Sequence, residues 1–145
     1  MLRTIQRCLI AIPLIAAHVV ADDAAFRYYF DLSPRGIEEL DAITQTLADN
    51  VNLSPANAPI VVVLHGEEAN AFVRSDYGQY KALVDRTALL DAYGVIDVKM
   101  CATWMRVNGI RERDIPPFIE TVPYGAAEIE RLEARGDRPA PRVKI

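Results

Sequence analysis

The sequence predicts a three-layer α/β fold, with a mostly parallel sheet of four to five strands and helices on both faces. Segments rich in β-branched or aromatic residues alternate with segments whose apolar residues recur every three or four positions. Helices of this length between strands allow right-handed crossovers, which place the strands parallel. The strand order does not follow from periodicity.

Residues 1–21 have the layout of a secretory signal. Two arginines precede an apolar run from Cys8 to Val20, and Ala21 supplies a small residue for cleavage. The run is shorter than the ~20 residues of a membrane-spanning helix, and Pro13 interrupts it. The sequence therefore predicts cleavage after Ala21, a single domain at residues 22–145 without a membrane span, and a periplasmic or secreted location.

Charge and cysteine content narrow the function further. Loss of the signal changes the formal net charge from −4 to −6, so nucleic acid and anionic lipid are not expected partners. Cys8 leaves with the signal, and Cys101 then has no partner for an internal disulfide.

The first half of the chain predicts a strand at 26–32, a helix at 37–51, a strand at 60–64 and a helix over 80–90. The β-branched run at 60–64 is typical of a strand buried on both faces. Asp76 is expected to cap the second helix, and Gly94 is expected to end it.

The second half predicts a strand at 95–100, a short helix ending at Gly109, a strand at 118–122, a helix before Gly136 and an edge strand at 142–145. Thr103 is the expected cap of the short helix. Pro139 and Pro141 are expected to confine the last strand to 142–145, because proline cannot donate to a sheet ladder.

Two candidate functional residues follow strands of the predicted sheet. His65 and Cys101 both come at carboxyl ends, where ligands bind in open parallel sheets. Cys101 also precedes a helix N-terminus, which favours a thiolate; the alternative is a small buried hydrophobe without chemistry. His65 is a candidate base, or else a turn residue. No cofactor is expected, and no metal, because zinc needs a third ligand.

Charged residues after the 60–64 strand allow two interpretations. The loop that contains Arg74 is either one wall of a ligand site or a simple helix cap. In the first case Arg74 is the candidate for binding an anionic sulfur species or a carboxylate. Glu67 and Glu68 are better explained by a helix dipole than by acid–base catalysis.

The strand VIDVKMC with its short helix and Gly109, followed by ETVPYGAAEIERL, resembles the DsrE/DsrF-like group that includes the TusD and YchN proteins. The His65-Gly66 pair resembles the V-H-G pattern of an exported branch. The resemblance implies a homo-oligomer (dimer, trimer or hexamer) and a persulfide-carrying cysteine, matched here by Cys101. Trp104 stands where some relatives have a second cysteine, so Cys101 would act as a lone thiol.

Two functions remain open from the sequence. In the first, Cys101 accepts sulfane sulfur as a persulfide and passes it on, with a sulfur donor or acceptor protein as partner. His65 is then a catalytic candidate, and the substrate-binding candidates are Arg74, Gly66 and Thr103. In the second, the chain is a noncatalytic oligomeric binding or assembly module in which Cys101 is structural.

Overall fold

The computed structural model describes residues 27–32, 36–50 and 58–141. The predicted signal at 1–21 and the expected strand at 142–145 lie outside these residues. In the described part of the chain, four α-helices connect successive strands. They are α1 (Gly36–Asp49), α2 (Tyr77–Ala92), α3 (Ala102–Val107) and α4 (Gly125–Ala134). Three short 3-10 turns complete the helical part: η2 (Glu67–Phe72), η3 (Arg74–Asp76) and η4 (Glu112–Asp114).

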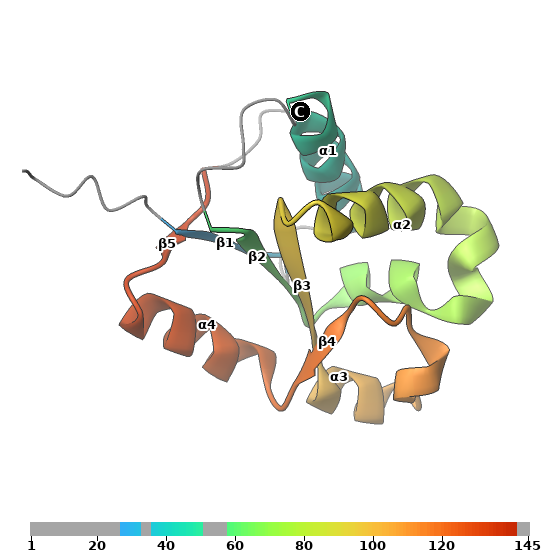
Figure 1. Ribbon diagram of the computed structural model, residues 1–145. Coiled ribbons are helices and arrows are strands. Elements are labelled where there is room, and N and C mark those ends of the chain that lie inside the picture. The colour runs from blue at the N-terminus through green and yellow to red at the C-terminus, as the bar shows by residue number, and fades with distance from the viewer. Residues whose placement is uncertain (1–26, 33–35, 51–57, 142–145) are drawn as a thin grey trace, which may run out of the picture.

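All five strands are parallel and form one sheet in the order β4-β3-β2-β1-β5. The strands are β1 (Tyr28–Asp31), β2 (Ile60–Leu64), β3 (Ile96–Cys101), β4 (Glu120–Val122) and β5 (Arg138–Pro139). Figure 1 shows α1 and α2 on one side of the sheet and α4 on the other. The predicted three-layer α/β fold is thereby confirmed.

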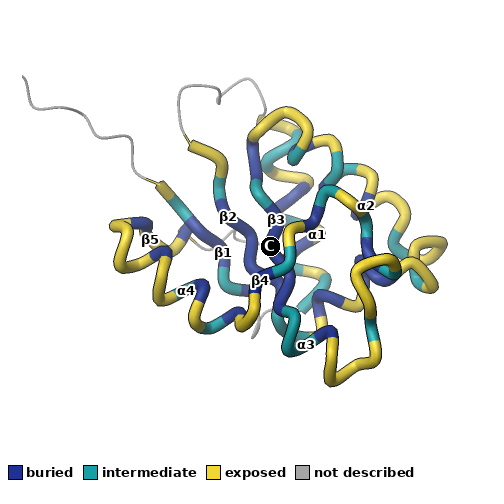
Figure 2. Tube along the Cα trace, turned by 60° about the horizontal axis from the view of Figure 1, so that its bottom comes forward, coloured by how far each residue is buried: buried dark blue, intermediate teal, exposed yellow. Residues whose placement is uncertain are grey.

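The larger core fills the α1/α2 face of the sheet. Phe30, Leu64 and Met100 point to this face, together with Leu40 of α1 and Leu83 of α2. Figure 2 shows the buried strands between helices whose outer surfaces are exposed. The burial of β2 on both faces confirms the prediction from its β-branched run.

The α4 face of the sheet holds a much smaller apolar cluster. Tyr29, Val61 and Val63 pack there against Leu132 and Ile129 of α4. Because side chains alternate along a strand, His65, Lys99 and Cys101 belong to this same face, opposite Leu64 and Met100.

The last strand of the sheet begins earlier in the chain than the predicted strand at 142–145. β5 pairs with β1 at Arg138 and Pro139, and the Arg138 and Ala140 amides donate to the Arg27 and Tyr29 carbonyls at 2.9 and 2.8 Å. The expectation that proline excludes a strand here was wrong. Only alternate amides of an edge strand face the neighbouring strand, and the position without an N–H is the one that faces outward.

Two 3-10 turns and a kink lie between β2 and the regular part of α2. The helix expected to open at Glu67 and Glu68 is the short 3-10 turn η2, and the expected loop at Arg74 forms the η3 turn. Tyr80 has non-helical angles (φ −108°, ψ 18°) within α2. Gly94 does follow α2 with φ +67°, in the left-handed region expected for a residue that ends a helix.

Candidate functional site

Cys101 is the last residue of β3 and the N-cap of α3. Its Sγ accepts a hydrogen bond from the Trp104 backbone N–H at 3.4 Å, and the residue is 3% exposed. The cap is therefore Cys101 itself, and the expected cap, Thr103, lies one residue inside the helix. Its Oγ1 instead donates to the Pro123 carbonyl at 3.0 Å, which ties α3 to the segment between β4 and α4.

The chain leaves β3 and β4 in opposite directions, and this divergence places Cys101 at a topological switch. β3 leads into α3, whose Met105 packs in the larger core, whereas β4 leads into α4 on the other face. In open α/β sheets, ligands bind outside the carboxyl ends of strands where the connections diverge in this way. Cys101 pairs directly with Val122 of β4 at that point.

His65 lies beside Cys101 on the neighbouring strand. Leu64 pairs with Met100, so the next residues of the two chains, His65 and Cys101, come at the same level of the sheet. The His65 Nε2 is 2.9 Å from Asp31 Oδ1 at the end of β1. The order across the sheet is thus Asp31, His65, Cys101: a carboxylate contacts an imidazole, and the thiol is carried by the next strand.

The first turn of helix α4 packs closely against His65. A Cβ placed on Gly125 would lie 2.6 Å from the His65 Cβ and 2.7 Å from its Cγ. Only glycine permits this approach, which covers the imidazole and leaves the side chain of His65 18% exposed. The helix packing and the Asp31 contact together fix the direction of the ring.

Glu68 holds the backbone that carries His65. Its Oε1 accepts the N–H groups of His65 and Gly66, both at 2.8 Å, and the residue is completely buried. The prediction explained Glu68 by its favourable interaction with a helix dipole and missed this role. The N–H groups that Glu68 binds belong to residues that precede the η2 turn. Its Oε2 has no hydrogen-bond partner within the described part of the chain. The contribution of Gly66 to the site is its backbone N–H group, which donates to Glu68.

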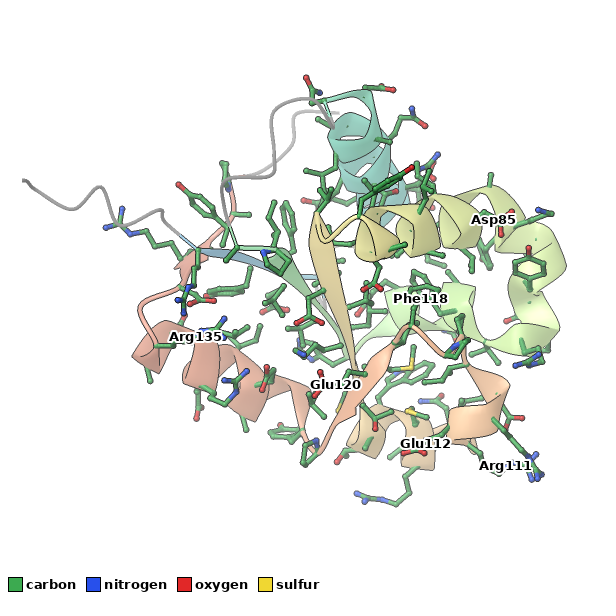
Figure 3. All side chains as sticks on the ribbon, viewed as in Figure 1. Asp85, Arg111, Glu112, Phe118, Glu120 and Arg135 are labelled. Carbon is green, nitrogen blue, oxygen red and sulfur yellow. The ribbon has the colours of Figure 1, made fainter. Side chains whose placement is uncertain are left out.

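A row of charges continues from this edge along the α4 face. Lys99, 7% exposed, contacts Asp97 at 3.0 Å and Glu120 at 2.5 Å. Burial lowers the pKa of Lys99, but hydrogen bonds to Glu120 and Asp97 outweigh it and raise that pKa above its ordinary value. Figure 3 shows Glu120 on the side of β4 that faces α4. In α4, a hydrogen bond from Arg131 lowers the pKa of Glu128.

The structure does not bring Arg74 into this arrangement. Arg74 lines a pocket on the α2 face whose walls include neither Cys101 nor His65. Asp76 occupies the N-cap position of α2 as expected, but its side chain makes no capping hydrogen bond.

Three contributions to the site were missed from the sequence: Asp31, Glu68 and Gly125. Asp31 ends a strand just as His65 does, so its position alone was a usable signal. The other two depend on contacts between segments that no local pattern encodes. The described residues contain no group of three or more His, Cys, Asp or Glu side chains that would hold a metal, and none of their helices is long and apolar enough to cross a membrane.

The arrangement of helices and strands defines a three-layer α/β protein, and comparisons with known proteins agree at this level. No family model matches the sequence, and no curated protein matches it. Among solved structures, the chain is similar to MTH1491, a protein of unknown function from Methanobacterium thermoautotrophicum. The TM-score is 0.59 at 16% identity, over 80% of this chain and 95% of that chain. Similarity at this identity shows a shared fold.

Proposed function

We propose that the chain is an exported sulfur-handling protein of DsrE-like type, in which Cys101 accepts sulfane sulfur and passes it on as a persulfide. The observation that carries the proposal is the row Asp31, His65, Cys101 at the switch between β3 and β4. Nucleophilic cysteines are commonly paired with a histidine that a third group orients. The resemblance of the β3–α3 segment to sulfur-relay proteins suggests that the chemistry is persulfide transfer.

In the proposed step, His65 takes the Cys101 proton and the thiolate attacks a terminal sulfur of a polysulfide. A sulfur–sulfur bond of the polysulfide breaks as the new Cys101 Sγ–S bond forms, and the shortened polysulfide leaves with the electron pair. The polysulfide is the oxidant, so no other co-reactant is needed. A hydrogen bond from the Trp104 amide to Sγ strengthens as negative charge develops on the sulfur. Transfer to an acceptor then reverses the same bond changes.

The test is intact mass after polysulfide treatment of protein in which Cys101 is the sole thiol, with Cys8 replaced by Ser. We expect mass additions of one sulfur that reductant removes and that Cys101→Ser abolishes. His65→Gln should slow the addition by about 100-fold, the lower range for loss of a general base. Asp31→Asn should slow it by a smaller factor, because the base is misoriented rather than removed. Equal rates in all these variants would refute the assigned roles.

The burial of Cys101 favours the second candidate function, a noncatalytic binding or assembly module. A residue that is 3% exposed is protected from bulky thiol reagents, and a buried cysteine ordinarily serves as a small hydrophobe. If Cys101 in the folded protein resists both polysulfide and thiol reagents, this module is the better account. Reaction with polysulfide but not with a bulky maleimide would support the carrier and indicate a narrow entry.

Export and assembly complete the proposal. The pattern at 1–21 supports a periplasmic or secreted location, and the mass of protein recovered after expression with its own signal should correspond to a chain that begins at Asp22. The resemblance supports a homo-oligomer. Light scattering of the purified protein should then give a dimer, trimer or hexamer mass, and a monomer at all concentrations would contradict this part.

A further inference from the structure

A pocket on the α2 face lies apart from the cysteine edge. Its volume is about 330 Å³, and its walls come from the end of η2, the η3 turn, helix α2 between Tyr77 and Ala88, and the 115–118 segment. Figure 3 labels two of its residues, Phe118 and Asp85, on the side of the sheet where α2 lies. The volume falls at the small end of the range for small-molecule sites.

The inner walls of the pocket are apolar and firmly held. Phe72 is 1% exposed and meets Phe118 edge to face, with ring centroids 6.5 Å apart and an interplanar angle of 80°. Pro116 and Pro117 also line the pocket and present no amide donors. An aromatic or aliphatic body placed here would exchange water for these surfaces.

The mouth of the pocket carries one uncompensated positive charge. The Arg74 side chain lines the pocket, is exposed, and has no hydrogen-bond or ion-pair partner within the described ranges. Asp85 also lines the pocket, but Lys81 and the Tyr77 hydroxyl both contact its carboxylate. The negative charge of the Asp85 carboxylate is therefore compensated by Lys81. The charge that remains for a ligand is that of the Arg74 guanidinium.

We propose that this pocket binds a small organic acid, with its apolar body between the phenylalanines and the prolines and its carboxylate on Arg74. A guanidinium binds a carboxylate through two parallel hydrogen bonds, which selects an acid over a neutral analogue of the same shape. The site is independent of sulfur chemistry at Cys101. The Cys101→Ser variant should therefore bind the acid as tightly as the original protein does.

The test compares 3-phenylpropanoate with 3-phenylpropanol, a matched pair that differs in the charged group, by titration calorimetry on the full chain. The acid should bind about 10-fold more tightly than the alcohol, the effect of one charge-assisted interaction. Arg74→Gln should remove this preference while it leaves alcohol binding unchanged. Arg113→Gln, which removes an exposed arginine outside the pocket, should leave both affinities unchanged.

Ala88→Leu tests the location, because Ala88 lines the pocket from α2 and a larger side chain would occupy it. Binding of both probes should be lost, while the helical circular dichroism and the melting temperature stay near those of the original protein. The proposal is overturned if neither probe binds at millimolar concentration, if the two bind equally, or if Ala88→Leu leaves binding intact.

Discussion

The two faces of the sheet carry different kinds of side chains. The α1/α2 face is a continuous apolar core, whereas the α4 face has a small apolar cluster surrounded by charged and hydrogen-bonded groups. Both faces come from the same strands, since neighbouring residues such as Met100 and Cys101 point in opposite directions. The apolar contacts that stabilise this fold therefore lie mainly on one face of the sheet, and the candidate functional residues lie on the other.

The largest expected effect is on the apolar face. Leu64→Ala removes a completely buried side chain from the larger core and should lower the free energy of unfolding by about 3 kcal/mol. Urea denaturation followed by circular dichroism measures the change. A loss below about 1 kcal/mol would contradict the assignment of stability to this face.

The close approach of α4 to His65 allows a sharper test of the charged face. Gly125→Ala would place a methyl group against the His65 ring and should destabilise the fold by about 2 kcal/mol, as overpacking does. Gly78→Ala is the matched control, because a Cβ there meets nothing within 4 Å. That control lies in α2 and should raise stability slightly. Equal thermal shifts in the two variants would contradict the tight packing at His65.

Tyr29 gives the charged face a pH dependence. Its burial and its 2.7 Å hydrogen bond to Glu133 raise the pKa of Tyr29 from 10.0 to about 12. The folded state thus holds this proton after the unfolded state has lost it. The resulting stability is fully present below pH 10 and is lost between about pH 10 and 12.

The Tyr29→Phe variant isolates this effect. It should lose about 1 kcal/mol at neutral pH with the hydrogen bond, and should show a shallower decline in stability between pH 10 and 12. The difference in tyrosinate absorbance between the two proteins should titrate near pH 12. Titration of that difference near pH 10 would show that the hydroxyl is exposed to solvent.

The smallest effect is expected from Lys99→Met. The methionine keeps the apolar stem, and the acidic partners Asp97 and Glu120 have side chains that are 38% and 64% exposed, so water can solvate them. We expect a change in the free energy of unfolding below about 1 kcal/mol, in either direction. A loss comparable to that of Leu64→Ala would mean that the ion pairs, and not the apolar core, stabilise this edge.

Much of the fold could be predicted because its determinants are local. The β-branched run of β2, the three-and-four spacing of α1 and the glycine after α2 each specify their element through backbone sterics and amphipathic burial. β5 was misplaced because the tolerance of Pro139 depends on which of its sides faces β1, and this is a property of the assembled sheet.

The fold class, the strand-end positions of His65 and Cys101, and the lack of a second cysteine beside Cys101 could all be obtained from the amino-acid sequence. The pairing of β2 with β3, the contact of Asp31 with His65, and the separate pocket of Arg74 became known from the three-dimensional structure. These features depend on contacts between residues that are far apart in the sequence. The apolar periodicity of a segment depends on which of its sides is buried, whereas a site depends on which segments contact one another, and strand order and helix packing set those contacts.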